Sequence, residues 1–280
     1  MTTQTAITRA IILSAGQGSR LLPVTADLPK CLIPFAGKTL IEWQIAALAA
    51  NGIGDIHVVT GFRTEKVEAA LAGISGPTIT THFNPFYKVA DNLGSCWIVR
   101  EAMDRDFIIL NGDTLIDPAI VAALIAGATS PITVTVDVKD AYDADDMKVH
   151  RANDGRLIAI GKRLEPQESN AESIGMLAFT GAGPALFRAQ VDAMMRTPEG
   201  VLNWYLKAIH AIAQSAPATG TADSAPAVGT VSIAGMDWAE VDFPADLAIA
   251  GALTARWAAQ PGQPSFSQAT SASRSASGSA

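Results

Sequence analysis

The residues best suited to chemistry lie in a glycine-rich segment near the N-terminus. This segment reads S-A-G-Q-G-S-R over residues 14–20 and follows an apolar run at residues 10–13. Glycine lets a backbone turn sharply and approach a ligand closely, and successive backbone N–H groups then form an anion-binding concavity. Arg20 and Lys30 can add positive charge to the same place. The pattern predicts a loop that binds phosphate, with an ordinary strand-to-loop turn carrying surface charges as the alternative.

Two common phosphate-binding motifs do not fit this segment. The dinucleotide-binding fingerprint requires a third glycine at the position of Leu21, and the P-loop pattern G-x-x-x-x-G-K-[ST] is absent from the chain. A nicotinamide-dependent oxidoreductase is therefore disfavoured.

Two aspartates are candidates for holding a metal ion. Asp113 follows the apolar run at residues 107–110 in the string N-G-D, at the end of a predicted strand where open α/β sheets bind ligands. Asp242 ends the string W-A-E-V-D at residues 238–242. Mg²⁺ prefers oxygen ligands and usually takes one or two carboxylates together with substrate phosphates. The alternatives are a turn-forming role for Asp113 and a helix-start role for Asp242.

Together, these strings resemble the sugar-phosphate nucleotidyltransferase family. Its signature is a strand, then A-G-x-G-[ST]-R and, after a short spacer, P-K-x-L-x-P. The chain reads A-G-Q-G-S-R at residues 15–20 and P-K-C-L-I-P at residues 29–34. A W-x-E-[IV]-D string followed by Asp246-Leu247 matches near the other end. The resemblance covers roughly residues 8–258 and implies an α/β, Rossmann-like fold of the GT-A type, with a mostly parallel mixed sheet flanked by helices.

The resemblance also implies a reaction and a set of site residues. A phosphate oxygen of a small acceptor would attack the α-phosphorus of a nucleoside triphosphate in line and release pyrophosphate. Because the acceptor is already anionic, the barrier is electrostatic and calls for positioning and charge rather than a general base. The implied catalytic residues are Arg20 and Lys30, and the implied Mg²⁺ ligands are Asp113 and Asp242, with Glu240 nearby. The implied nucleotide-binding residues of the loop and strand ends are Leu13, Ala15, Gly16, Gly18, Ser19 and Gly112.

A second set of strings indicates the nucleotide and the acceptor. The element N-x-x-S, formed by Asn92 and Ser95, resembles the branch of phosphocholine and aminoethylphosphonate cytidylyltransferases, so CTP is the favoured nucleotide. This branch implies a small phosphorylated acceptor held by Lys162, Lys148, Asp146 and Glu172. In the alternative reading, Asn92 and Ser95 cap a helix, the lysines lie on strand edges and the acids form a solvated turn.

Two other functions are open at this point. A sugar-1-phosphate uridylyl- or thymidylyltransferase would use the same fold and the same metal-binding residues. A non-catalytic nucleotide-sensing module would be expected to lose the metal or phosphate residues, and the presence of Arg20, Lys30, Asp113 and Asp242 argues against it.

The elements that would position these residues alternate between strands and helices in the first half of the chain. Strands are predicted at residues 10–13, 56–60, 78–82, 107–110 and 132–138. Helices are predicted from residue 39, at 64–71, at 94–103 and from residue 118. This alternation indicates βαβ units and a mostly parallel sheet. Further strands predicted at 147–150, 157–160 and 173–179 make part of the sheet antiparallel, and helices are predicted at 200–213 and 244–259.

The composition indicates one domain at residues 1–259. Residues 214–229 and 260–280 are rich in Ala, Ser, Thr and Gly, a composition that predicts a flexible loop and a disordered tail. The formal net charge of the 280-residue chain is −7, without the clustered Lys and Arg of a nucleic-acid binder.

Cysteine usage and hydropathy bear on the cellular compartment. Two cysteines are too few for a secreted disulfide scaffold. No run approaches the roughly 18 consecutive apolar residues of a membrane helix, so no membrane insertion is expected. The N-terminal residues lack the layout of a signal peptide, and we expect a cytoplasmic protein. The sequence leaves the oligomeric state open, a homo-oligomer included.

Overall fold

A nine-stranded mixed sheet runs through the part of the chain that the computed structural model describes, residues 6–215 and 226–260. Its strands follow the order β10-β9-β11-β6-β1-β4-β5, and β8 and β12 extend it beside β11. The strands are β1 (Arg9–Ser14), β4 (Asp55–Thr60), β5 (Thr78–Phe83), β6 (Phe107–Asn111), β8 (Ile132–Asp137), β9 (Lys148–Arg151), β10 (Leu157–Ile160), β11 (Ala171–Phe179) and β12 (Val228–Ser232). Two small sheets pair β7 (Thr114–Ile116) with β13 (Trp238–Glu240) and β2 (Pro34–Phe35) with β3 (Lys38–Thr39).

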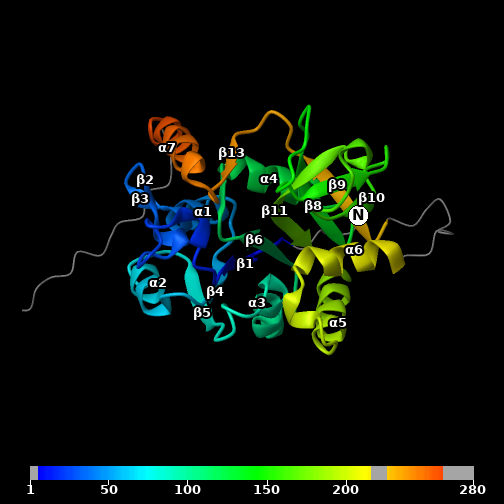
Figure 1. The fold of residues 1–280 in the computed structure, drawn as a ribbon, viewed down its shortest axis with the longest axis horizontal. Helices are drawn as coiled ribbons and strands as arrows, with labels where there is room; N and C mark the ends of the chain where they lie inside the picture. Colours follow the sequence, from blue (N-terminus) through cyan, green and yellow to red (C-terminus); the bar gives the residue numbers. More distant parts are fainter. Residues whose placement is uncertain (1–5, 216–225, 261–280) are drawn as a thin grey trace, which may run out of the picture.

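Helices cover both faces of the large sheet. They are α1 (Leu40–Ala49), α2 (Thr64–Leu71), α3 (Asn92–Ile98), α4 (Pro118–Gly127), α5 (Gly183–Met195), α6 (Tyr205–Ser215) and α7 (Pro244–Ala258). Successive side chains of a strand point to opposite faces, so the fully buried Ile11 and Ile12 of β1 enter different cores. Ile11 belongs to the core formed with α3, α5 and α6, and Ile12 to the core formed with α1, α2 and α4. In Figure 1, α1 and α7 lie at one end of the molecule, and α5 and α6 lie beside β8 to β10 at the other.

The strands around β1 are parallel, as the alternation of strands and helices predicted. β1 pairs in parallel with β4 on one side and with β6 on the other, and β4 pairs in parallel with β5. The carboxyl ends of these strands therefore meet at one edge of the sheet. β11 runs antiparallel to β6, β8 and β9, which confirms the antiparallel part expected from the second half of the chain.

Local capping signals are confirmed where two helices begin. The Thr39 hydroxyl accepts from the Glu42 amide at 3.4 Å, and Glu42 Oε2 accepts from the Thr39 amide at 2.6 Å, which is a capping box at the start of α1. Asp117 Oδ1 accepts from the Ala119 amide at 2.8 Å, and Pro118 occupies the first turn of α4.

Several predicted boundaries are corrected. The helix predicted at 94–103 ends at Ile98 and is followed by the 3₁₀ helix Arg100–Ala102. The helix predicted at 200–213 begins only at Tyr205, after the 3₁₀ helix Gly200–Leu202, and α5 was not predicted. The remaining 3₁₀ helices are Ser19–Leu21, Lys30–Leu32 and Pro166–Glu168.

The two ends of the segment expected to be a loop at residues 214–229 belong to regular elements instead. Gln214 and Ser215 belong to α6, while Val228 and Gly229 begin β12, which pairs in parallel with β8. The β-branched residues of the V-G-T-V-S string outweigh its small-residue composition. Residues 216–225 and 261–280 lie outside the described part of the chain.

Within the described ranges, no helix combines the length and the apolar character that crossing a bilayer requires.

Candidate active site

The glycine-rich loop and Asp113 meet where β1 and β6 end side by side. The Gly112 amide donates to the Leu13 carbonyl at 3.0 Å. A Cβ at Gly112 would lie 2.4 Å from the Ser14 hydroxyl oxygen, so only glycine permits this close approach. The two predicted motifs are therefore held together by the adjacent parallel strands, at the edge where such sheets bind ligands.

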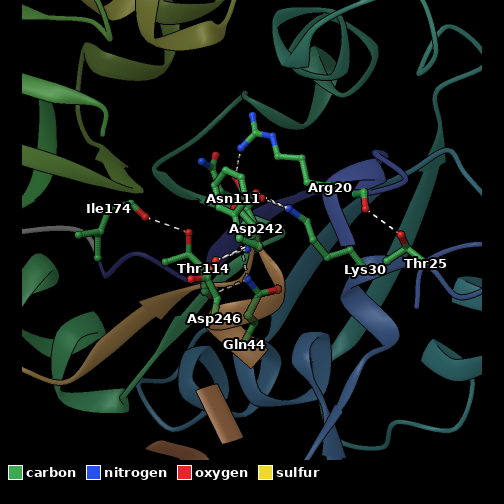
Figure 2. A network of polar contacts seen from close by, with 12 residues as sticks. Arg20, Thr25, Lys30, Gln44, Asn111, Thr114, Ile174, Asp242 and Asp246 are labelled. Atoms are coloured by element: carbon green, nitrogen blue, oxygen red, sulfur yellow. Dashed lines mark hydrogen bonds and ion pairs between the residues drawn. The ribbon is translucent and has the colours of Figure 1, made fainter. Parts of the chain in front are cut away.

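The loop after β1 folds back over Lys30. Gly18 has φ +73°, in the left-handed region that favours glycine, and a Cβ there would lie 3.1 Å from the Lys30 side chain. The Thr25 hydroxyl donates to the Gly18 carbonyl at 2.7 Å and closes the loop (Figure 2). The glycine that the sequence motif indicated therefore lets the loop backbone pack against the side chain of Lys30.

Lys30 lies between the two predicted metal ligands. Its ammonium donates to Asp113 Oδ2 at 2.8 Å and to Asp242 Oδ1 at 2.5 Å. Arg20 Nη1 donates to Asp242 Oδ2 at 2.9 Å, and Figure 2 shows Arg20 and Lys30 reaching toward the same aspartate. Burial alone would lower the pKa of Lys30, but the charges of Asp113 and Asp242 outweigh it and raise that pKa above its ordinary value. The structure therefore brings all four residues together.

Asp242 is presented by β13 and by the start of α7. The Val241 amide donates to the Asp113 carbonyl at 3.0 Å, which fixes the segment after β13 beside the end of β6. Asp246 Oδ2 accepts from the amides of Asp242 and Phe243 at 2.9 and 2.7 Å. Asp246 is therefore the helix-start acid of α7, and the carboxylate of Asp242 is left to pair with Lys30 and Arg20.

Three carboxylates at this point fit a hard divalent cation. Asp113, Glu240 and Asp242 can each place an oxygen within 4.8 Å of the others. Asp113 Oδ1 is buried and has no hydrogen-bond partner, which leaves it available to a ligand. Glu240 is exposed to the cleft, yet partial desolvation and then the charges of Asp113 and Asp242 raise its pKa to about 8. Oxygen donors of this kind are those that Mg²⁺ prefers.

The cleft has two halves that meet at this cluster. One half is lined by the predicted nucleotide residues Leu13, Gly16, Gly18 and Gly112, together with Lys30. The other half is lined by the predicted acceptor residues Asp146, Lys162 and Glu172, together with Trp204, Trp238 and Glu240. Asn92, Asn111 and Asp113 line both halves.

Three predicted nucleotide residues do not line the cleft. Ala15 is buried, and its carbonyl accepts from the Phe62 amide at 2.9 Å. Ser19 is exposed at the start of a 3₁₀ helix. Ser95 is buried in α3, where its hydroxyl accepts from Asn84 Nδ2 at 3.1 Å.

Asn92 reaches the cleft while it also serves the fold. Its Oδ1 accepts from the Tyr205 amide at 2.9 Å and so links the start of α3 to the start of α6. Neither Asn92 nor Ser95 is the N-cap of α3, because Asp91 holds that position without a side-chain bond. The capping alternative for this string is therefore wrong.

Lys148 is placed differently from its prediction. The residue is 3% exposed and is absent from the lining of the cleft. Its ammonium donates to the Lys162 carbonyl at 2.9 Å and is 3.5 Å from the Ala144 carbonyl. Lys148 lies opposite Glu172 in the pairing of β9 with β11, whereas Lys162 follows β10 and lines the cleft. Lys148 therefore stabilises the segment that carries Lys162 and does not line the acceptor half itself.

The acceptor half combines a lysine, acids and indole rings. The Lys162 ammonium lies 5.3 Å from the centre of the Trp204 ring. Glu172 is nearly buried and its Oε1 is 2.6 Å from the ammonium of Lys139, a residue that the motifs did not indicate. Burial raises the pKa of Glu172 to about 7, although the Lys139 ammonium opposes that rise. This half can hold a phosphate at Lys162 and a polar or cationic group near the acids.

Comparison with known proteins identifies a family and several relatives. The profile of the family described as nucleotidyl transferase matches residues 9–159. A CTP:phosphoglutamine cytidylyltransferase of Campylobacter jejuni is 26% identical over 86% of this chain and 98% of its own length. A choline-phosphate cytidylyltransferase of Streptococcus pneumoniae is 35% identical over 36% of this chain and 43% of its own. A CMP-5'-(3-aminopropyl)phosphonate synthase of Streptomyces rubellomurinus is 31% identical over 53% of this chain, which spans a quarter of that protein.

Solved structures confirm the expected fold. The inositol-1-phosphate CTP transferase from T. maritima superposes with a TM-score of 0.72 at 20% identity, covering 90% of this chain and 96% of that one. A CTP:phosphocholine cytidylyltransferase from Streptococcus pneumoniae gives 0.70 at 19% identity, covering 88% and 98%. The matched profile covers the loop, Lys30 and Asp113, and the fold agrees with it, so the chain belongs to the nucleotidyl transferase family.

Proposed function

We propose that this protein transfers CMP from CTP to a small phosphorylated acceptor and releases pyrophosphate, with Mg²⁺ held by Asp113 and Asp242. The observation that carries the proposal is the position of Lys30. Its ammonium bridges both aspartates at the point where the two halves of the cleft meet. A nucleotidyl transfer requires positive charge at this place, because two anionic phosphates must approach each other there.

Different residues of the chain bind the two reactants. The amides of the glycine-rich loop bind the phosphates that depart, and Lys162 binds the phosphate of the acceptor. The guanidinium of Arg20, which lines the acceptor half beside Asp242, adds positive charge where the two reactants meet. An acceptor phosphate oxygen forms a bond to the α-phosphorus, and the bond from that phosphorus to the bridging oxygen breaks. The electron pair of the broken bond leaves with pyrophosphate. Mg²⁺, when bound, neutralises charge on the phosphates and helps to align them.

Three of the similar proteins support CTP as the nucleotide, while others are guanyl- or uridylyltransferases by name. The three relatives described above act with cytidine nucleotides according to their names, and one of them matches nearly its whole length. The same three names include an amino acid phosphate, an amino alcohol phosphate and an aminoalkyl phosphonate as acceptors or products. The indole rings of Trp204 and Trp238 in the acceptor half suit an acceptor that carries a quaternary ammonium group in addition to its phosphate. Asp146 and Glu172 lie in the same half and pair with the Lys139 ammonium.

The test is release of pyrophosphate with Mg²⁺ from each of CTP, UTP, dTTP, ATP and GTP. Each nucleotide is paired with phosphocholine, 2-aminoethylphosphonate, an amino acid phosphate and a panel of sugar-1-phosphates. We expect release with CTP and an acceptor of the amine-bearing class. Release only with UTP or dTTP and a sugar phosphate would replace CMP transfer by a uridylyl- or thymidylyltransferase reaction. Nucleotide binding without release for any pair would support a sensing module.

A further inference from the structure

Both carboxylate oxygens of Asp242 pair with cations of the chain itself. Its Oδ1 accepts from the Lys30 ammonium at 2.5 Å, and its Oδ2 accepts from Arg20 Nη1 at 2.9 Å (Figure 2). Asp242 is also one of the three carboxylates that can meet around a divalent cation. An oxygen that already pairs with one cation is a poor ligand for a second, because the two positive charges repel each other. The metal ion that we propose must therefore compete with one of these two side chains for Asp242.

The two cations differ in how firmly they are held. The side chain of Lys30 is 13% exposed, and its ammonium also donates to Asp113 Oδ2 at 2.8 Å. The side chain of Arg20 is 46% exposed, and among the described residues Asp242 is the only carboxylate with which it pairs. Ion pairs of such exposed side chains contribute little to stability. Arg20 is therefore the cation that leaves Asp242 at small cost, whereas Lys30 stays in place.

Arg20 lies where a phosphate group can take it from Asp242. It belongs to the 3₁₀ helix Ser19–Leu21, directly after the turn at Gly18, and it lines the cleft. Its guanidinium is 5.0 Å from the centre of the Phe243 ring, so it lies at the rim of the site beside Asp242. A guanidinium presents five N–H donors in a fixed fork that matches a phosphate as well as a carboxylate. A phosphate in the cleft can therefore bind Arg20 and leave Asp242 Oδ2 open.

We propose that Arg20 closes Asp242 to the divalent cation until a phosphate group of the nucleotide takes the guanidinium. This inference rests on the proposed function, which calls for both the metal ion and the nucleotide. Asp113 keeps one oxygen for the metal throughout, because its Oδ1 is buried and accepts no hydrogen bond within the described residues. A cation that arrives alone meets only part of its ligand set. Metal binding and phosphate binding are therefore coupled through Arg20, and each tightens the other.

The main test measures binding of Mn²⁺, as a probe for Mg²⁺, to the full chain without nucleotide by electron paramagnetic resonance. Arg20→Met removes the competing guanidinium and keeps a long side chain. We expect it to lower the Kd of Mn²⁺ about tenfold relative to the wild type, within the usual range of coupling between two sites. Arg256→Met is the matched control, since Arg256 forms an exposed ion pair with Asp237 at 2.8 Å, and its Kd should stay within about twofold of the wild type. Circular dichroism confirms that each variant is folded.

A double-mutant cycle distinguishes competition for Asp242 from repulsion at a distance. In an Asp242→Asn background, the carboxylate for which Arg20 competes is gone. Arg20→Met should then change the Kd of Mn²⁺ by no more than about twofold, so the effects of the two substitutions should not add. A gain in Mn²⁺ affinity of the same size in this background would show that Arg20 acts through its charge alone, and it would overturn the proposal.

Sulfate tests the phosphate side of the coupling, because it is a tetrahedral dianion that a guanidinium binds much as it binds a phosphate group. Compared with chloride at the same ionic strength, sulfate should tighten Mn²⁺ binding by the wild type and should not do so in Arg20→Met. An equal effect of sulfate on the two proteins would overturn the coupling through Arg20.

The outcomes separate this inference from the proposed function. Mn²⁺ binding by Arg20→Met that is no tighter than binding by the wild type, undetectable binding by both included, would overturn the role of Arg20 even where the wild type turns over CTP. Absence of turnover by the wild type with every nucleotide and acceptor would reject the proposed function. The Mn²⁺ titrations require no turnover, and they would still report whether Arg20 competes for Asp242.

Discussion

The ammonium of Lys30 lies 2.5 Å from Asp242 Oδ1, although 212 residues separate the two in the chain. The same ammonium is 2.8 Å from Asp113 Oδ2, at a separation of 83 residues. Two carboxylates at this point would repel each other, and the lysine between them offsets that repulsion. The catalytic lysine that we propose is therefore also the group that holds the proposed metal ligands together in the free protein.

Replacing Lys30 with alanine should lower kcat by roughly 10²–10³-fold, because one positive group aimed at the transferred phosphates is lost. Pyrophosphate release under saturating substrates measures the change. Lys66→Ala is the matched control, since Lys66 forms an exposed ion pair with Asp27 and donates to the Asp27 carbonyl at 2.8 Å, away from the cleft, and it should retain wild-type turnover. Wild-type turnover in a folded Lys30→Ala variant would contradict the site assignment.

Removal of divalent cations should stop the reaction. We expect EDTA to abolish pyrophosphate release and added Mg²⁺ to restore it, because the three neighbouring carboxylates have the oxygen donors that this ion prefers. Asp113→Asn should raise the Mg²⁺ concentration needed for half-maximal activity. Asp117→Asn, which keeps a good N-cap for α4, is its control and should leave the Mg²⁺ titration unchanged. Full activity in EDTA would exclude the metal role.

Replacing Lys148 with methionine should weaken binding of the acceptor and leave binding of the nucleotide unchanged. The change removes the bond from the Lys148 ammonium to the Lys162 carbonyl and so frees the segment that carries Lys162. We expect the KM of the acceptor to rise about tenfold, equivalent to ~1.4 kcal/mol, with the Kd of CTP unchanged. If Lys148 acts through Lys162, then Lys148→Met should add little in a Lys162→Met background. Equal and independent losses in the two variants would show that Lys148 acts by another route.

Glu172 should make the protein less stable as the pH rises. Burial raises its pKa to about 7 in the folded protein from an ordinary value of 4.5. The folded state therefore binds more protons than the unfolded chain between these values, and the free energy of unfolding falls as the pH rises through that window. The charged groups around Glu172 include Lys139 and Asp146, with Lys148 opposite it on β9 and Asp137 opposite it on β8.

Chemical denaturation at several pH values between 4.5 and 8 tests this prediction against Glu172→Gln. The variant cannot ionise at this position, so the wild type should lose stability relative to it as the pH rises and the difference should level off above pH about 7. Glu168→Gln, at an exposed position, controls for the loss of one carboxylate elsewhere. A wild type that gains stability relative to Glu172→Gln over this range would contradict the raised pKa.

Local signals in the sequence determined much of the fold. The Thr39 and Glu42 pair begins α1, Asp117 and Pro118 begin α4, and the β-branched runs form the predicted strands. The glycine spacing after β1 and the string around Lys30 were enough to indicate a phosphate-binding loop. These features depend on residues a few positions apart, so a linear reading detects them. α5 has Pro184 in its first turn but no side-chain cap, and it was not predicted. The 3₁₀ segments before α6 and after α3 also have no side-chain caps, and their boundaries were missed.

Contacts between distant segments decided what the sequence left open. The sequence left a helix-start role open for Asp242. In the structure, β13 pairs with β7, Asp242 pairs with Lys30, and Asp246 accepts from the Phe243 amide at the start of α7. Tertiary contacts likewise distinguish the two lysines, because the buried Lys148 ammonium donates to the Lys162 carbonyl while Lys162 itself lines the cleft.

Asn111 is the clearest case of a residue whose position only the tertiary structure reveals. The sequence places it before Gly112 and Asp113 but says nothing of Gly175, which lies on another strand and leaves the space for its amide. Motifs record residues that are close along the chain. The site depends on which side chains the sheet brings within hydrogen-bonding distance, and that follows from strand order and register.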